Sequence, residues 1–336
     1  MRRSALARIT QAALPILNNL DPETAHDLAL AGLRWLKPLW PRLEVSPSLS
    51  VSCFGLRFAH PLGLAAGFDK NGDYLDALGA LGFSHIELGT VTPRPQPGNP
   101  KPRMFRVAHS CALINRMGFN NKGVDHLVAR LARSRYRGIR GISIGKNFHT
   151  PLANAQDDYL ACLRKVYACA DYVAVNISSP NTAGLRELQG RDGLQRILGS
   201  LLEERRALQG RFGKRVPLLV KIAPDLDSGQ IGALAENLRT VGIDGGVDGV
   251  IATNTFAVEH EGGLSGAPLH PMSLRVISRL RAELGASFPI IGVGGILNAD
   301  NALNMLRAGA NLLQIYTGFA YRGSALLEEI LRALPA

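Results

Sequence analysis

Cysteine is scarce in this chain of 336 residues, and several chemical signatures are missing. The four cysteines are scattered, with no Cys-x-x-Cys pair and no histidine at zinc-finger spacing. This pattern predicts reduced, mostly buried thiols in a cytosolic setting. The sequence also has no Ser/His/Asp arrangement at a recognisable spacing, no His-rich cluster and no Gly-x-Gly-x-x-Gly after the first predicted strand. Hydrolysis, metal chemistry and Rossmann-type nicotinamide binding therefore lose support.

Long hydrophobic runs are absent as well. No apolar run reaches the roughly 20 residues that a membrane-spanning helix needs. The N-terminus is basic at Arg2 and Arg3, but Arg8, Thr10 and Gln11 interrupt any signal-peptide core, and no small-x-small cleavage site follows. We therefore expect a protein that is not secreted.

Acidic residues are few, and the net charge is +11. Residues 91–140 hold eleven Lys and Arg against one acid, Asp125, whereas residues 1–45 carry only +2. A concentrated basic segment favours an anionic lipid, a nucleic acid or an anionic substrate as partner, but a solvated surface remains an alternative. Charge alone does not choose between them.

Short apolar runs, in contrast, recur along the chain from residue 61 onward. They are rich in β-branched residues, nearly continuous in hydrophobicity and mostly end in Gly, Asn, Thr or Ser, as parallel strands buried on both faces do. The eight runs are residues 62–67, 85–90, 141–147, 172–178, 217–223, 249–254, 289–296 and 312–318.

Helical patterns separate most of these runs, for example at residues 160–170, 193–209, 230–241 and 273–284. Eight strand and helix units over about 270 residues predict an α/β fold of the TIM (β/α)8 barrel type. A doubly wound sheet also alternates strands and helices, but eight regular units make it the weaker alternative. Active sites of such barrels lie at the carboxyl ends of the strands. The candidate residues are therefore the polar ones that end the runs: Lys70, Thr90, Lys146, Asn147, Asn176, Ser179, Lys221, Thr253, Asn254 and Thr317.

Residues 1–45 form a separate unit ahead of the barrel of residues 46–336. Apolar residues recur there at helical spacing, although Pro15 is expected to break or kink the first helix. Asp21 is a suitable N-cap for a second helix, with Pro22 at its first turn, that runs to about Trp35. This small helical hairpin either packs on the barrel or lies in a membrane interface.

The connection after the second predicted strand, residues 91–140, is unusually long for this fold. It begins with a proline-rich stretch at residues 92–102 that is not compatible with a helix. Connections of this length tend to be functional.

Glycines near the last two predicted strands indicate a phosphate site. Gly292, Gly294 and Gly295 allow close approach to backbone N–H groups, and Thr317 follows on the eighth strand. TIM barrels often bind phosphate between these two strands, although tight turns would also explain the glycines.

Lysines and asparagines near the other strand ends predict a polar ligand. Lys221 lies inside an apolar strand, so its charge needs an anionic or polar partner such as a phosphate or a flavin ring. Five hydrogen-bonding side chains crowd residues 176–182, and Asn254 and Thr255 add two more. Converging amides suit a flat imide or urea-like ligand, although turns and helix caps would also use such residues.

Six motifs in this order resemble the dihydroorotate dehydrogenase family, in its membrane-associated, quinone-linked class. The motifs are AAGFDK at 65–70, GTVTPRPQPG at 89–98, NRMGFNN at 115–121, NISSPN at 176–181, GGLSG at 262–266 and GVGG at 292–295. The resemblance covers essentially the whole chain, including the N-terminal hairpin. Only the stretch 256–261 looks shorter than in many relatives.

The resemblance implies oxidation of (S)-dihydroorotate to orotate in pyrimidine biosynthesis, with one noncovalent FMN per chain. The residues implied to contact FMN are Ala66, Gly67, Phe68, Asp69, Lys70, Thr90, Asn147, Asn176, Lys221, Thr253, Gly266, Gly295, Tyr316 and Thr317. Those implied to hold the pyrimidine are Lys70, Asn115, Arg116, Met117, Gly118, Phe119, Asn176, Asn181, Asn254 and Thr255.

Ser179 matches the catalytic base of the family, which removes a proton from C5 while hydride leaves C6. Because a hydroxyl is a weak base, we expect help from water and from Thr182. The soluble classes have Cys at this position.

A membrane quinone then reoxidises the flavin, and the resemblance implies that His26, Arg106 and Tyr316 line its site. For His26 the alternative is an exposed helix position. The resemblance further implies a monomeric, peripheral protein on the cytoplasmic face of the inner membrane, with no metal and no nucleic acid. We also expect the basic segment to help docking on anionic lipid.

Three other functions remain as alternatives. A soluble dehydrogenase would reduce fumarate or nicotinamide and would not need residues 1–45. An RNA-modifying flavin barrel would use the basic segment, although the sequence has no appended RNA-binding domain. A non-enzymatic lipid-binding protein would carry no flavin.

Overall fold

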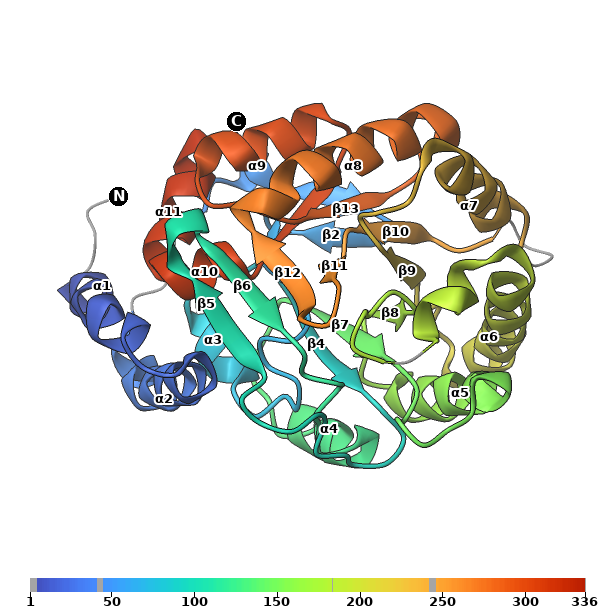
Figure 1. Cartoon of the computed structure of the whole chain (residues 1–336), viewed down its shortest axis with the longest axis horizontal. Coiled ribbons are helices and arrows are strands. Elements are labelled where there is room, and N and C mark those ends of the chain that lie inside the picture. Colours follow the sequence, from blue (N-terminus) through green and yellow to red (C-terminus); the bar gives the residue numbers. More distant parts are fainter. Residues whose placement is uncertain (1–4, 41–44, 183, 242–245, 336) are drawn as a thin grey trace.

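The computed structural model describes residues 5–40, 45–182, 184–241 and 246–335. Its centre is a closed barrel of parallel strands in the order β10-β13-β14-β3-β4-β7-β8-β9 (Figure 1). The strands are β3 (Leu62–Leu64), β4 (His85–Val91), β7 (Ile139–Ile144), β8 (Tyr172–Asn176), β9 (Leu218–Ile222), β10 (Gly249–Ala252), β13 (Ile290–Val293) and β14 (Leu312–Ile315). All eight overlap the predicted runs, so the (β/α)8 barrel is confirmed.

The barrel strands are mostly apolar because both of their faces are covered. Every residue of β4, β8, β9 and β14 is buried, between helices outside and packed side chains inside. Charged or amide side chains in such strands are therefore exceptional. Glu87, Lys221 and Gln314 are three of them.

Helices surround the barrel (Figure 1). They are α3 (Leu75–Ala80), α4 (Val124–Leu131), α5 (Ala155–Val166), α6 (Arg191–Phe212), α7 (Ser228–Thr240), α8 (His270–Leu284), α9 (Ala299–Arg307), α10 (Thr317–Arg322) and α11 (Ser324–Ala333). The predicted helices are confirmed, although α5 begins and ends earlier than the predicted 160–170. Local capping explains one of the boundaries, because Asp227 and Gln230 form a capping box at the start of α7.

The long connection 91–140 contributes two strands to a second, antiparallel sheet. These strands, β5 (Met104–Val107) and β6 (Ala112–Asn115), join β11 (Phe256–Val258) and β12 (Gly262–Gly266) in the order β11-β12-β6-β5. The stretch 256–261, which looks short in the sequence, forms β11 and a tight turn into β12. The sheet covers the carboxyl ends of the barrel strands, since β6 and β12 line the same cavity as those ends.

A small hairpin packs at the opposite end of the barrel. It consists of β1 (Val51–Cys53) and β2 (Leu56–Phe58). The Phe58 ring is fully buried and lies 5.2 Å from the ring of His85, the first residue of β4.

Two N-terminal helices, α1 (Ala5–Asn18) and α2 (Pro22–Leu36), stand at one side of the barrel (Figure 1). The predicted cap is confirmed, because the Asp21 side chain accepts a hydrogen bond of 2.9 Å from the Thr24 N–H. Of the two effects predicted for Pro15, the break is wrong, since α1 continues to Asn18 with Pro15 inside it, and the kink stays a prediction. Pro15 is exposed, so water can satisfy the carbonyl that loses its helical partner. Arg2 and Arg3 lie outside the described residues.

The helical pair has one face on the barrel and another facing outward. Ala25 and Leu30 of α2 are buried, whereas Ile16, Leu28 and Trp35 are 68%, 52% and 84% exposed. Packing on the barrel therefore accounts for only part of the apolar surface. Among the described residues, none of the helices has the length and hydropathy to span a bilayer.

The basic segment 91–140 is partly neutralised by acids from other segments. Lys122 and Arg130 pair with Asp73, while Lys101 and Arg103 pair with Glu23. Among the described residues, four of its eleven cations thus have an acidic partner from another segment. The cysteines are free, and of the four only Cys111 is exposed.

Candidate active site

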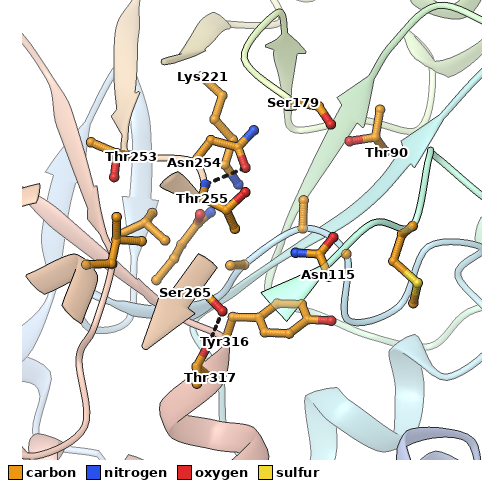
Figure 2. Close-up of a pocket in the computed structure, with 18 of the residues that line it drawn as sticks. Thr90, Asn115, Ser179, Lys221, Thr253, Asn254, Thr255, Ser265, Tyr316 and Thr317 are labelled. Carbon is orange, nitrogen blue, oxygen red and sulfur yellow. Dashed lines mark hydrogen bonds between the residues drawn. The ribbon is translucent and has the colours of Figure 1, made fainter. Parts of the chain in front are cut away.

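A cavity lies at the carboxyl ends of the barrel strands, beneath the second sheet (Figure 2). Its walls come from loops that are far apart in the sequence but meet at this edge of the barrel. Twenty of the residues predicted from the sequence line it: Ala66, Gly67, Lys70, Thr90, Asn115, Met117, Gly118, Phe119, Asn176, Ser179, Asn181, Lys221, Thr253, Asn254, Thr255, Gly266, Gly294, Gly295, Tyr316 and Thr317.

The asparagine side chains of the cavity are held by one another and by hydroxyl groups. The Asn176 amide donates a hydrogen bond of 2.8 Å to the Thr90 hydroxyl, and the Asn254 amide donates one of 3.3 Å to the side-chain oxygen Oδ1 of Asn176. Asn181 donates 3.0 Å to the Asn115 side chain. These bonds connect β4, β6 and the loops after β8 and β10, so the amides converge in fixed orientations.

Ser179 lies in the loop that follows β8, and Figure 2 shows it near the same wall as Thr90. It is buried, and its hydroxyl accepts a hydrogen bond of 3.3 Å from the Asn181 N–H. The neighbouring Ser178 faces elsewhere and donates 2.7 Å to the Lys221 carbonyl. Within the described chain, Thr182 is buried and makes no direct hydrogen bond with Ser179, so a relay through Thr182 stays a prediction.

Lys70 brings a positive charge to the cavity. Its ammonium donates 2.9 Å to the Gly67 carbonyl. Burial lowers the pKa of Lys70 to about 8, although the Glu23 carboxylate acts in the opposite direction. Lys146, in contrast, donates to the carbonyls of Asn147 and Thr150 and is not part of the cavity wall.

The acidic partner of Lys221 was missed in the sequence. The Lys221 ammonium lies 3.6 Å from a carboxylate oxygen of Glu87, which belongs to β4 and is fully buried. Gln314 of β14 also lines the cavity without having been predicted. Both residues interrupt apolar strands, which is the signal that had singled out Lys221.

Besides Lys146 and Gly292, four predicted residues lie outside the cavity wall, and the side chains of these four have other partners. The Asp69 carboxylate accepts three backbone N–H bonds in the turn before α3, the closest from Tyr74 at 2.8 Å. The Arg116 guanidinium donates to the Pro102 carbonyl and lies over the Phe105 ring.

The other two of these residues are Asn147 and Phe68. The side-chain amide of Asn147 donates hydrogen bonds to the Thr92 hydroxyl, the Arg94 carbonyl and the Gln96 side chain. It therefore anchors the start of the long connection. Phe68 faces a second cavity instead.

This second cavity lies between the N-terminal helices and the barrel. Its wall is mostly apolar and includes Leu14, Leu17, Ala29, Leu33 and Phe319, together with the predicted His26, Arg106 and Tyr316. Tyr316 lines both cavities. The ring of Phe68 lies 4.8 Å from that of His26 and 5.3 Å from that of Tyr316, so three rings lead from one cavity toward the other.

His26 is half-buried in this wall, which argues against a plain exposed helix position. Burial, with the nearby charge of Lys70, lowers its pKa to about 4. Arg106 donates 2.6 Å to the Asn18 carbonyl and 3.1 Å to the Leu20 carbonyl, which ties the turn between α1 and α2 to β5.

Comparison with known proteins agrees with this geometry. Residues 48–336 match the sequence model of the family described as Dihydroorotate dehydrogenase. The chain is 52% identical over 327 residues to the dihydroorotate dehydrogenase (quinone) of Aromatoleum aromaticum, covering 96% of this chain and 93% of that protein. It is 53% identical to that of Cellvibrio japonicus, covering 93% and 94%.

Solved structures give the same result. The crystal structure of DHODH from Eimeria tenella in complex with ferulenol superposes with a TM-score of 0.85 at 38% identity, covering 96% of this chain and 93% of that one. Its ligand-free form gives 0.82 at 38% identity, covering 93% and 94%. The chain therefore belongs to the dihydroorotate dehydrogenase family.

Proposed function

We propose that this protein oxidises (S)-dihydroorotate to orotate through bound FMN and passes the electrons to a membrane quinone, as a step of pyrimidine biosynthesis. The observation that carries the proposal is the pair of cavities that share Tyr316, one polar and one apolar. A polar pyrimidine acid and an apolar quinone need different sites that both reach the same flavin. The quinone-linked names of the relatives support the same acceptor.

The residues of the polar cavity fit FMN. Within the described chain, the buried side-chain oxygen Oε1 of Gln314 has no hydrogen-bond partner, and the buried Lys221 ammonium has Glu87 alone at 3.6 Å. Both line the cavity and suit the polar edge of an isoalloxazine. The first N–H groups of α10 and the Gly294–Gly295 backbone are suited to a phosphate. Bound FMN supplies the acceptor for the hydride that leaves C6 of the substrate.

The substrate is held by Lys70 and the fixed amides. A protonated Lys70 pairs with the carboxylate of dihydroorotate, while the amides of Asn115, Asn176 and Asn254 match the donors and acceptors of its imide ring. Because these amides are already held by Thr90, Ser178 and each other, binding requires little reordering of the cavity.

Ser179 is the proposed base. Its hydroxyl oxygen accepts one hydrogen bond, from the Asn181 N–H, and keeps a lone pair that can accept the C5 proton as the hydroxyl passes its own proton to a water molecule. Its buried position excludes bulk water from the reacting carbon. A positioned base of this kind contributes about 10²-fold or more to the rate.

The apolar cavity is the proposed quinone site, with His26, Arg106 and Tyr316 at its polar points. The exposed apolar side chains of Ile16 and Trp35 are placed to enter a lipid surface beside it. We place the protein at the cytoplasmic face of the cell membrane, attached by this helical pair.

An anaerobic titration of the purified full chain tests the proposal. We expect a flavin absorbance spectrum that dihydroorotate bleaches and that a short-chain quinone restores. Restoration by fumarate or a nicotinamide, with none by quinone, would favour a soluble class. A colourless protein, or a spectrum that dihydroorotate leaves unchanged, would overturn the proposal.

A further inference from the structure

A buried acid lies inside the barrel, below the floor of the polar cavity, and has no role in the half-reactions proposed above. Glu87 of β4 has no exposed surface and does not line the cavity itself. Its neighbours are Tyr172 of β8, Lys221 of β9 and Gln314 of β14. Side chains from four barrel strands thus form one polar cluster in an otherwise apolar interior.

Hydrogen bonds hold one oxygen of the Glu87 carboxylate. Its Oε2 accepts a hydrogen bond of 3.0 Å from the Tyr172 hydroxyl and one of 2.9 Å from the Gln314 amide. The same amide also donates a hydrogen bond of 3.1 Å to the Tyr172 oxygen. Burial, followed by the Glu87 charge, raises the pKa of the Tyr172 phenol well above its ordinary value, so the phenol is a neutral donor. Every neighbour of the carboxylate donates, as the ionised form requires.

The other carboxylate oxygen faces the lysine. Oε1 of Glu87 makes no hydrogen bond within the described chain, and the Lys221 ammonium lies 3.6 Å from it. At this distance the two side chains compensate each other's charge, while the N–H groups of Lys221 remain available to the cavity that it lines. An isolated buried ammonium is costly, so the acid lowers the free energy of the charged lysine in this interior.

We propose that Glu87 is a positioning residue that acts through Lys221 and sets the reduction potential of the flavin. The inference rests on the proposed function. Reduction adds negative charge to a flavin, and the cluster now presents a positive and a negative charge that nearly cancel. Neutralising Glu87 leaves the positive charge of Lys221 uncompensated and favours the reduced flavin. Neutralising Lys221 leaves the negative charge and has the opposite effect.

The test is a set of reduction potentials measured on flavin-loaded, full-length variants against an indicator dye. For Glu87→Gln, which preserves the shape of the side chain, we expect the reduced-to-oxidised ratio at a given potential to rise about tenfold, or about 30 mV for a two-electron couple. For Lys221→Met we expect a fall of similar size. The double variant is expected to lie close to the unaltered protein. Sulfite, an anion that binds flavins without turnover, should bind Glu87→Gln about tenfold more tightly.

Asp248→Asn is the matched control, because the Asp248 side chain is also paired and only 8% exposed, but it precedes β10 at the far end of the barrel. Its potential should be unchanged. Glu87→Gln, with its unpaired lysine, could fail to fold. The effect of Glu87 is then measured by comparing the double variant with Lys221→Met. Removing Glu87 from the Lys221→Met protein must raise the reduction potential. This inference alone would be overturned if flavin-loaded Glu87→Gln had the potential of the unaltered protein, or if the double variant had the potential of Lys221→Met. A protein that holds no flavin would overturn the proposed function instead.

Discussion

The Glu23 carboxylate of α2 lies 2.7 Å from the Arg103 guanidinium, and both side chains are buried. Arg103 also donates to the carbonyls of Pro97 and Asn99, and its own carbonyl accepts 2.8 Å from the Arg116 N–H. Asn99 in turn donates to the Arg116 and Met117 carbonyls. One ion pair therefore connects a helix of the apolar cavity to the loop proposed to hold the pyrimidine.

We expect Glu23→Gln to raise the orotate dissociation constant about tenfold, because losing a charge-assisted hydrogen bond of about 1.5 kcal/mol loosens this loop. Titration of the flavin spectrum with orotate measures it. Lys101→Ala is the control, since Lys101 contacts the same carboxylate but is 64% exposed and should change affinity less than about twofold. Equal effects of the two variants would contradict the coupling.

Ser179→Ala should slow flavin reduction by dihydroorotate at least about 10²-fold, because the C5 proton loses its acceptor. Stopped-flow absorbance follows this half-reaction alone. Reoxidation of the same variant by quinone should stay unchanged, since Ser179 does not line the apolar cavity. Flavin reduction at the unaltered rate would refute the assignment.

The lowered pKa of Lys70 predicts a pH dependence of orotate binding. The charged ammonium binds the carboxylate, and the free protein loses this charge as the pH rises through about 8. The orotate dissociation constant should be constant below that value and then rise about tenfold per pH unit. In Lys70→Arg the guanidinium stays charged, so any remaining binding should be independent of pH up to about 10. A constant affinity of the unaltered protein across this range would speak against Lys70.

The barrel and most of the cavity could be predicted because their signals are local. Strands buried on both faces leave nearly continuous apolar runs, and the strand ends point to the site. Lys221 was recognisable for the same reason, as a charge inside such a run. Glu87 and Gln314 carry the same signal, but their importance depends on which strands meet across the barrel, and this requires the closed topology.

Loop geometry explains the residues that did not reach the cavity. Asp69 and Asn147 lie at strand ends like the cavity residues, yet each satisfies backbone groups of its own connection. Residue type and position do not distinguish a side chain that binds a ligand from one that stabilises a turn. The pairing of β6 with β12 was equally beyond the sequence pattern, because both strands are short and far apart in the chain.

His26 makes the stability of the protein sensitive to acid. Burial first, and then the charge of Lys70, lowers its pKa to about 4 from an ordinary value of 6.5. Because the folded pKa is the lower one, the unfolded chain binds the proton more tightly. The contribution of neutral His26 to the free energy of unfolding is thus complete above pH 6.5, and it is lost as the pH falls toward 4. Between pH 6.5 and 4, the free energy of unfolding measured in urea should fall less for His26→Gln than for the unaltered protein. Parallel curves for the two proteins would exclude the effect.

Trp35 offers the sharpest test of membrane attachment. Its side chain is 84% exposed beside the apolar cavity, and inserting an indole of this size into lipid is worth about 1.5–3 kcal/mol. Trp35→Ala should therefore weaken binding to phospholipid vesicles at least tenfold in a sedimentation assay. Phe212→Ala is the matched control, because Phe212 is an exposed aromatic residue at the end of α6, away from the N-terminal helices, and should leave binding unchanged.

Since four cations of the basic segment already have acidic partners, high salt should weaken vesicle binding less than the loss of Trp35 does. Binding that is abolished by salt but indifferent to Trp35 would show that charge, and not the apolar helical face, holds the protein to the membrane.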